Sequence, residues 1–273
     1  DRSYRAPRRS VLYIFVGVVS FLTLLPSLIV IPLAFNKSKF VYFPPEAYSL
    51  KWIKTFFTGD PTGSSANWIT SSITSLELAL ITVVISVPLG GLVAYGIARG
   101  TFPGRGLLGS FVILPLIIPS SLTALALFYF YSINMRPMVG TIFGIGMPHA
   151  TLAIPFVVII LTATLRGIDQ VHEQAAMSLG ANRLTAFRRI ILPQIIPGIT
   201  VAAFFAFLVS FYEVRIAIFL KDPYIRSLPM NLWNGVTTDY APMMASVSAI
   251  LLVFAAIMVA VLIFFRSRFN GSK

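Results

Sequence analysis

The sequence predicts an all-α integral membrane protein with six transmembrane helices, and two observations carry this prediction. Of the 273 residues, 57% are hydrophobic and only 11% are charged, which is far from the composition of a soluble globular domain. The apolar residues also come in blocks of about 20, the length needed to cross about 30 Å of hydrocarbon. The chain has no cysteine, so disulfide bonds and thiol chemistry are excluded.

Six apolar segments account for the predicted helices, and a single transmembrane domain is expected to cover residues 1–273, with a core at about 71–265. A short surface helix is expected at Lys51–Phe57, between the first two segments. Prolines inside the segments are expected to kink them: Pro88, Pro115, Pro119 and Pro155. The segments lie at about 11–35, 71–98, 107–133, 149–165, 198–220 and 243–265.

Basic residues flank the segments unevenly, and this asymmetry orients the chain. Cytoplasmic loops of membrane proteins carry an excess of Lys and Arg. We therefore expect a multi-pass protein with both termini in the cytoplasm, and the net charge of +12 needs no nucleic-acid partner to explain it. The basic residues on the side placed inside are Arg2, Arg5, Arg8, Arg9, Arg99, Arg105, Arg166, Arg183, Arg188, Arg189, Arg266, Arg268 and Lys273.

Residues 166–197 form the only long run between apolar segments that is polar, favours helix and is strongly patterned, and we call this run the elbow. Its first part, from His172 to Leu179, consists mostly of good helix formers. Gly180 suits a left-handed helix cap, and Pro193 is expected to stop a second helix. The elbow is therefore predicted to be a helix, a sharp turn and a second helix on the cytoplasmic side.

The second helix of the elbow is predicted to have two faces. Leu184, Phe187 and Ile191 recur at i, i+3 and i+7, which predicts an apolar stripe lying against the membrane domain. The remaining surface is basic, and it either contacts lipid phosphates or acidic groups of a partner, or simply anchors the segment inside. The basic residues concerned are Arg183, Arg188 and Arg189.

The spacing within the elbow resembles the EAA loop of binding-protein-dependent ABC transporter permeases of the type I importer class. Ala175 and Ala176 are followed by three residues, then Gly180, then nine residues and the segment Ile190–Pro193. In that family the loop lies between the last two core helices, as it does here. It forms a coupling helix that docks in a groove of a separate ATPase.

The resemblance implies an ATPase-coupling role for a run of elbow residues. The family usually has Glu immediately before the paired alanines, whereas this chain has Gln174 there and Glu173 one position earlier. Either Glu173 supplies the charge or the position tolerates an amide. The implied coupling residues are Glu173, Gln174, Ala175, Ala176, Ser178, Leu179, Gly180, Ala181, Asn182 and Arg183.

The chain has no G-x-x-x-x-G-K-[ST] phosphate loop and no paired catalytic groups, so we expect neither ATP binding of the P-loop kind nor enzymatic activity. The resemblance implies a permease subunit in the bacterial inner membrane that forms half of the translocation path of an ATP-driven importer. The implied partners are a second homologous permease, an ATPase dimer that binds ATP and Mg, a periplasmic or lipid-anchored solute-binding protein, and membrane lipids. No cofactor is expected in this chain.

Ionisable residues within apolar segments are candidates for function because their burial is costly. Glu77 in the second segment and Glu213 in the fifth, with Tyr212 beside it, are expected on a water-filled path that attracts a cation. The alternative is that Glu77 or Glu213 pairs with Arg215 or forms a hydrogen bond inside the bundle. His149 opens the fourth segment and is expected at the membrane interface.

Several stretches resemble the spermidine/putrescine subfamily, among them Leu114–Pro119 and Ser210–Val214. That subfamily often has an acidic residue at the position of Tyr212. The resemblance implies a small polar solute, a polyamine, with an opine, an amino-acid derivative or another small solute as alternatives. A hypothesis of another class, an ion-coupled secondary transporter, predicts inverted repeats and midplane acids, and the sequence shows neither.

Overall fold

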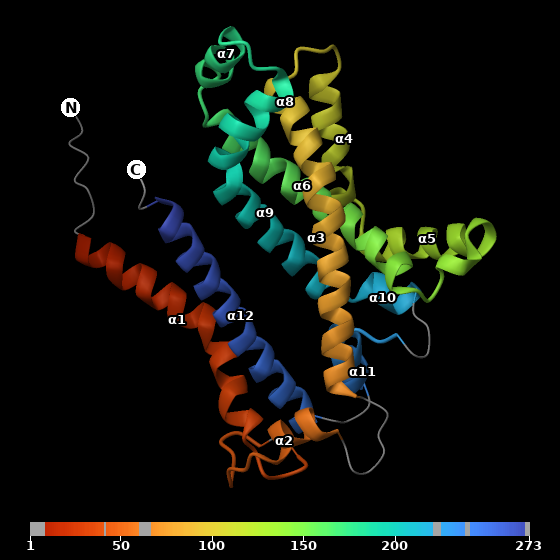
Figure 1. The fold of residues 1–273 in the computed structure, drawn as a ribbon. Helices are drawn as coiled ribbons and strands as arrows, with labels where there is room; N and C mark the ends of the chain where they lie inside the picture. Colours follow the sequence, from red (N-terminus) through yellow and green to blue (C-terminus); the bar gives the residue numbers. More distant parts are fainter. Residues whose placement is uncertain (1–8, 41, 60–66, 221–224, 238–240, 271–273) are drawn as a thin grey trace, which may run out of the picture. The chain divides into compact units, whose positions relative to one another are not determined.

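The computed structural model describes residues 9–40, 42–59, 67–220, 225–237 and 241–270, and the regular elements in these ranges are helices (Figure 1). The all-α prediction is therefore confirmed. The chain divides into two compact units: unit 1 comprises residues 1–67 and 234–257, and unit 2 comprises residues 68–233 and 258–273. The charges expected at Arg2, Arg5, Arg8 and Lys273 lie outside the described residues.

Unit 1 is built around the end of its first helix. Its elements are α1 (Arg9–Ala34), α2 (Lys51–Thr58), the end of α11 (Leu228–Thr237) and the first part of α12 (Ala241–Asn270). The Ser246 hydroxyl of α12 donates to the Ala34 carbonyl at 2.7 Å. Because Ala34 lies in the last turn of α1, its carbonyl has no partner within that helix. Asn36 is buried and its amide donates to the Phe40 carbonyl, which holds the turn after α1. The presence of α2 confirms the expected surface helix.

Unit 2 contains the elbow and the helices to which it is attached. In Figure 1, α7 and α8 lie at one end of the long helices α3, α6 and α9. The elements are α3 (Trp68–Arg99), α4 (Arg105–Ile117), α5 (Ser120–Asn134), η1 (Arg136–Met138), α6 (Ile142–Arg166), α7 (Val171–Ser178), α8 (Arg183–Ala186), the π-helix η2 (Phe187–Ile191), α9 (Leu192–Phe211), α10 (Arg215–Leu220), most of α11 and the last part of α12.

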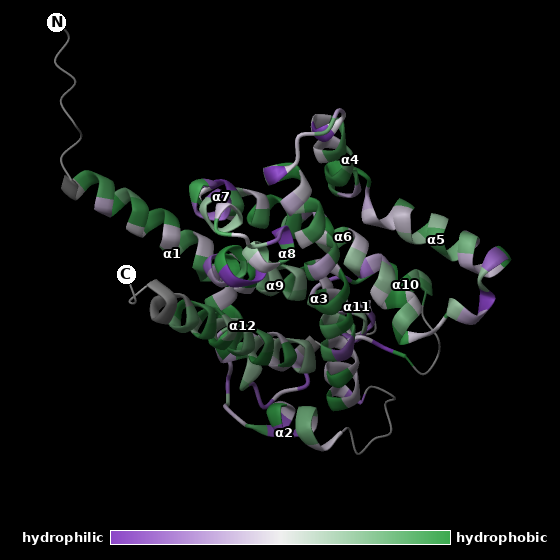
Figure 2. Cartoon of the chain, turned by 45° about the horizontal axis from the view of Figure 1, so that its top comes forward, coloured by the Kyte–Doolittle hydropathy of each residue, from purple (hydrophilic) through white to green (hydrophobic). Residues whose placement is uncertain are grey.

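The number of possible membrane crossings agrees with the prediction of six. Five of the described helices are long and apolar enough to span a membrane, and the number rises to six if the bent pair α4–α5 makes one crossing. Figure 2 shows that the helices of this pair are hydrophobic over most of their length. Because hydrocarbon offers the backbone no hydrogen bonds, helices of this kind are the expected way to cross it.

The third predicted segment is not a single kinked helix. It breaks into α4 and α5, whose axes differ by 94°. Ile118 between them is extended, with ψ 126°, and Pro119 precedes the first residue of α5. A residue before proline is pushed out of the helical region by the proline ring, so Pro119 accounts for the break. Pro115, by contrast, is accommodated inside α4.

The fifth predicted segment is also wrong in its second half. The helix ends at Phe211, and α10 begins again at Arg215 after a turn. The sequence pattern did not predict α11, which is held by contacts with α3 that are distant in sequence. The Leu228 backbone N–H donates to the Ser75 hydroxyl at 2.8 Å, and the Asn231 amide contacts the Ser71 hydroxyl.

Helices α3, α6 and α9 pack closely at three glycines, and we call these helices the three-helix core. A methyl group added at Gly90 of α3 would lie 2.7 Å from a Val157 carbon of α6. A methyl group added at Gly146 of α6 would lie 2.8 Å from an Ile81 carbon of α3, and one added at Gly198 of α9 would lie 2.5 Å from the Thr164 hydroxyl oxygen of α6. Small residues allow membrane helices to approach and gain van der Waals contact. Gly90, two residues after the kink expected at Pro88, is therefore a packing residue in a helix that runs unbroken from Trp68 to Arg99.

A buried polar network crosses the three-helix core. The Thr82 hydroxyl of α3 donates to the Ser210 hydroxyl of α9 at 3.0 Å, and Ser210 in turn lies 2.9 Å from Nδ1 of His149 of α6. All three side chains are fully or almost fully buried. The interfacial position expected for His149 is wrong, because α6 begins at Ile142, about two turns earlier than predicted.

Candidate coupling site

The elbow folds as predicted from its local sequence, beginning with α7. The Asp169 carboxylate accepts a hydrogen bond from the Val171 backbone N–H at 3.0 Å, which satisfies a donor at the start of the helix. At the other end, the Gly180 N–H bonds to the Met177 carbonyl and the Ala181 N–H to the Ala176 carbonyl. This pair of bonds is a Schellman motif, and Gly180 has the φ of +90° that the motif requires. The predicted left-handed cap is confirmed.

The second helix of the elbow starts at a capping residue. The Asn182 side-chain oxygen accepts a hydrogen bond from the Thr185 backbone N–H at 2.8 Å. Asn is among the preferred residues at this position because its short side chain reaches an otherwise unpaired N–H. The turn between α7 and α8 is therefore built from a glycine turn followed directly by a helix cap.

We expected the second helix to stop at Pro193, but the helix continues through this residue. It continues from α8 through η2 into α9, and residues Arg183–Phe211 form one membrane-length helix. Proline removes one backbone donor and crowds the preceding turn. The π-helical turn η2 widens that turn, and the Gln194 side-chain amide donates to the Ile190 carbonyl at 2.9 Å. Together they accommodate Pro193 within the first turn of α9.

The predicted apolar stripe is correct for two of its three residues. Ile191 is fully buried, and Phe187 packs on the Tyr95 ring of α3 with centroids 5.4 Å apart. Leu184, however, is 58% exposed. The spacing assumed an uninterrupted α-helix, whereas the π-helical turn that follows α8 changes the angular step between residues.

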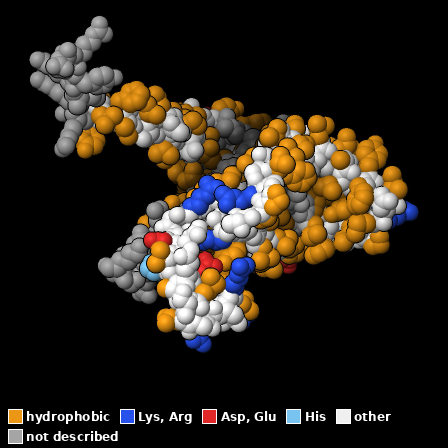
Figure 3. Space-filling model, turned by 90° about the horizontal axis from the view of Figure 1, so that it is seen from above, with side chains coloured by type: hydrophobic (Ala, Val, Ile, Leu, Met, Phe, Trp, Pro, Cys, Tyr) orange, Lys and Arg blue, Asp and Glu red, His pale blue; other side chains and the backbone are white. Residues whose placement is uncertain are grey.

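The implied coupling residues form a largely exposed surface of small and polar side chains, with one large apolar side chain at the turn. Leu179 is 90% exposed, and it precedes Gly180, around which no atom lies within 4 Å of an added methyl group. Figure 3, seen from the elbow end of unit 2, shows Lys and Arg side chains gathered near acidic ones on this face. The exposed members are Gln174, Ala175, Ser178, Leu179, Gly180, Asn182 and Arg183, and the partly exposed ones are Ala176 and Ala181.

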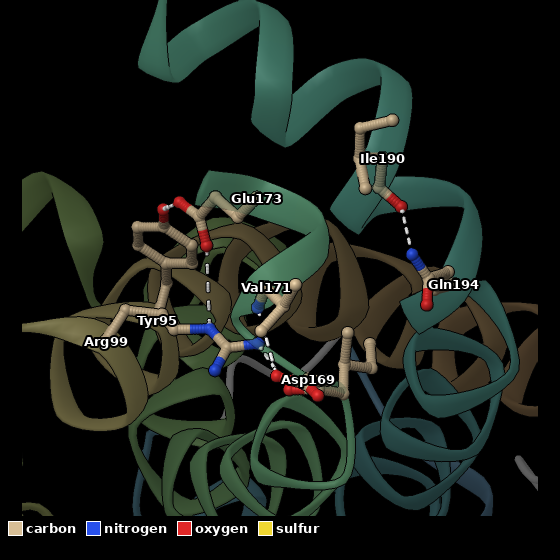
Figure 4. A network of polar contacts seen from close by, with 8 residues as sticks. Tyr95, Arg99, Asp169, Val171, Glu173, Ile190 and Gln194 are labelled. Atoms are coloured by element: carbon tan, nitrogen blue, oxygen red, sulfur yellow. Dashed lines mark hydrogen bonds and ion pairs between the residues drawn. The ribbon is translucent and has the colours of Figure 1, made fainter. Parts of the chain in front are cut away.

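Glu173 differs from the other coupling residues because its side chain points toward α3. The Tyr95 hydroxyl donates to Oε1 of Glu173 at 2.6 Å, and Nε of Arg99 lies 3.7 Å from Oε2 (Figure 4). Arg99 also donates through Nη2 to the Ile168 carbonyl at 2.8 Å. The side chains of Arg99 and Glu173 are only 8% and 12% exposed. Sequence reasoning missed Tyr95 and treated Arg99 only as an anchor, although their i, i+4 spacing on α3 puts both on one face.

Among the described residues, no hydrogen bond or ion pair joins the three residues predicted on a substrate path, and that path stays a prediction. Oε1 of Glu213 accepts the backbone N–H groups of Arg215 at 2.8 Å and Ile216 at 3.3 Å, so it caps α10. The Arg215 guanidinium donates instead to the Ser120 hydroxyl of α5. Tyr212 is half-exposed and Glu77 is exposed on α3. The Glu213 carboxylate therefore bonds to the backbone of its own turn, and no ion pair with Arg215 is found among the described residues.

These features define the class of protein as a multi-pass membrane subunit with an exposed helical elbow and no phosphate loop of its own. The chain belongs to the family of binding-protein-dependent transport system inner membrane components, which matches residues 86–271. It is therefore an ABC importer permease, a transport subunit and not an enzyme. Permeases of this family work with a solute-binding protein and an ATPase. This membership replaces the hypothesis of an ion-coupled secondary transporter.

Relatives of known activity span most of the chain. The spermidine/putrescine transport system permease protein PotC of Escherichia coli (strain K12) is 26% identical over 235 residues, which cover 86% of each chain. The trehalose transport system permease protein SugB of Mycobacterium tuberculosis (strain CDC 1551 / Oshkosh) is 32% identical over 200 residues, or 71% of each chain. The putrescine transport system permease protein PotI of Escherichia coli (strain K12) is 27% identical and covers 83% of this chain and 80% of its own.

Solved structures confirm the fold of a type I importer permease. A chain of a bacterial ABC transporter that imports the acidic polysaccharide alginate superposes with a TM-score of 0.67 at 16% identity, covering 93% of this chain and 94% of that chain. A second structure of a bacterial alginate ABC transporter, in complex with an alginate pentasaccharide-bound periplasmic protein, superposes with a TM-score of 0.62 at 18% identity, covering 93% and 92%.

Proposed function

We propose that the elbow is the site at which a cytoplasmic ATPase dimer drives this permease. The observation that carries the proposal is the exposed turn at Leu179 and Gly180, where a large apolar side chain stands next to an open left-handed glycine. Leu179 is 90% exposed at a turn outside the membrane-spanning helices, so its apolar side chain is available to a partner. Small neighbouring residues leave room for a groove to close around it.

The proposed assembly pairs this chain with a second, homologous permease, so that each forms half of the path. ATP and Mg bind to the ATPase dimer, whose closure draws the two elbows together. The resulting movement of the helices opens the path toward the docked solute-binding protein. In this arrangement the elbow and both termini face the cytoplasm, which agrees with the basic residues at the elbow end of unit 2.

Gly180 provides the sharpest test of docking. Gly180→Asn keeps a residue that tolerates the left-handed conformation, while Gly180→Asp adds a charge in the same space. Because the surroundings of Gly180 are open within this chain, both variants should insert into the membrane normally. We expect Gly180→Asp to abolish ATP-dependent uptake and ATPase co-purification. Leu179→Ser should also lose the ATPase, whereas Leu179→Met should retain it.

The control is the yield and monodispersity of each variant in detergent, which should match those of the unmodified chain. Normal uptake and normal ATPase recovery with Gly180→Asp would refute the docking proposal. If Gly180→Asp fails to accumulate in the membrane, Leu179→Ser takes its place as the test, because this substitution changes neither the glycine turn nor any buried contact.

We propose a polyamine as the transported solute. The support is the likeness to PotC and PotI, whose names specify spermidine and putrescine, together with the exposed carboxylate of Glu77 on α3. The second candidate is a sugar, which SugB favours through its higher identity of 32%. An opine or an amino-acid derivative is a further possibility within the same class.

The solute is best identified with the solute-binding protein that co-purifies with the importer. Calorimetric titration with putrescine, spermidine, trehalose and an amino acid would rank the classes directly. Saturable binding of a polyamine with no binding of the sugar is the expected result. Tight binding of trehalose alone would overturn the polyamine proposal and would leave the coupling proposal intact.

A further inference from the structure

Helix α7 reaches the three-helix core through two side chains of α3. Its own packing is on α8 and η2, its neighbours in sequence. The link to α3 is made by Tyr95 and Arg99, which extend from the last turns of that helix to the Glu173 carboxylate (Figure 4). Among the described residues, this is the one ion pair between side chains.

Tyr95 joins three elements at once. Its ring packs edge-to-face on Phe187 of η2, with an interplanar angle of 83°, and its hydroxyl donates to Glu173 of α7. The ring contact fixes the direction in which the hydroxyl points. A hydrogen bond to a carboxylate is stronger than one between neutral groups, and this one is short at 2.6 Å.

Arg99 closes the link from the other side. Its Nε lies next to the Glu173 carboxylate, and its Nη2 donates to the Ile168 carbonyl at 2.8 Å. Arg99 therefore contacts the chain both before α7 and within it. Both charged side chains are almost covered, and removing one partner of such a pair leaves an uncompensated buried charge. The carboxylate of Glu173 is therefore engaged inside the permease and is not presented to a partner, whereas the adjacent Gln174 is exposed.

We propose that Tyr95, Glu173 and Arg99 form a rigid link that makes α7 and the elbow end of α3 move as one body during the transport cycle. The inference rests on the proposed docking of an ATPase at the elbow. It assigns Glu173 a positioning role and makes Gln174 the residue of this pair that faces the partner. A displacement of α7 is then carried into α3, and through the close contact at Gly90 into α6.

The lack of cysteine allows the link to be tested by distance measurement, because two introduced cysteines would be the only ones in the chain. His172→Cys on α7 and Leu89→Cys on α3 are exposed positions outside the proposed docking surface. Spin labels at these sites report the distance between the helices by pulsed electron paramagnetic resonance. The assembled importer is measured without nucleotide and after trapping with ADP and vanadate.

With the native link, we expect one narrow distance that is the same in both states. Tyr95→Phe keeps the ring contact with Phe187 and removes only the hydroxyl. In this variant we expect the narrow distance between the labels to be lost and the ATPase to remain bound. Glu173→Gln keeps an acceptor for the Tyr95 hydroxyl but removes the ion pair with Arg99. This variant therefore distinguishes the effect of the ion pair from that of the hydrogen bond. An unchanged, narrow distance in both Tyr95→Phe and Glu173→Gln would overturn the link.

Leu179→Ser distinguishes failure of the link from failure of the docking proposal. We expect this variant to lose the ATPase and to keep the narrow distance when the permease is measured without the ATPase. If Leu179→Ser retains the ATPase, docking at the turn is refuted, and the label distances in the Tyr95→Phe variant still decide whether α7 is fixed to α3. If Tyr95→Phe itself loses the ATPase but keeps a narrow distance, the positioning role is refuted.

Discussion

The elbow and the three-helix core belong to the same unit but are stabilised in opposite ways. The turn of the elbow between α7 and α8 is exposed, and its shape comes from local backbone features such as the glycine turn at Gly180 and the cap at Asn182. The core is buried, and its shape comes from contacts between residues far apart in sequence, such as Gly90 with Val157. The comparison indicates that the elbow can be changed without unfolding the protein, whereas the core cannot.

The largest effect is expected at Gly90, where the comparison predicts failure of folding. A leucine there must displace Val157, since even a methyl group would lie 2.7 Å away. Overpacking of this kind costs about 1–3 kcal/mol or more. We expect Gly90→Leu to lose the monodisperse protein peak in detergent. Gly96→Leu is the matched control on the same helix, because nothing lies within 4 Å of an added methyl group there. Equal yields of the two variants would contradict the packing argument.

An intermediate effect is expected at Ser210, which joins Thr82 and His149 inside the core. Ser210→Ala leaves both partners without that bond. Double-mutant cycles put interhelical hydrogen bonds in membranes at about 0.6 kcal/mol on average, with a maximum of about 1.7. We expect a lower melting temperature with no loss of ATPase binding. Ser132→Ala, at an exposed position on α5, should leave the melting temperature unchanged and serves as the reference.

The smallest effect is expected at Gln174, the exposed neighbour of Glu173. Gln174→Glu introduces the acid that the family usually has before the paired alanines. Because the side chain is exposed, the melting temperature should not change. A charge at the rim of an interface contributes about 0.2–1 kcal/mol, so ATPase affinity should change by less than about tenfold in either direction. A large drop in melting temperature would show that Gln174 is part of the fold.

Local patterns predicted the elements whose structure depends on nearby residues. The Schellman turn at Gly180 followed from a glycine after a run of helix formers, and the elbow motif led to the correct family. The helix breaks were less predictable. The break at Pro119 depends on one proline in a segment where Pro115 is tolerated, and the restart at Arg215 depends on the Glu213 side chain folding back onto the backbone.

Contacts between distant residues could not be predicted from the pattern. Thr82, His149 and Ser210 lie on three different helices, and Tyr95 and Glu173 are separated by 78 residues. Glu173 illustrates the limit well. Its position beside Gln174 suggested a charge offered to a partner, whereas the fold places its carboxylate against α3.

The sequence by itself determined the all-helical membrane class, the elbow with its left-handed turn and, through the elbow motif, the transporter family. The first two properties follow from apolar block length and from a glycine in a helix-forming run, both of which are local. Only the tertiary structure decided which elbow residues face outward and which residue joins α7 to α3. That decision depends on the packing of α3 against α6 and α9, which brings the Tyr95 and Arg99 side chains within reach of Glu173.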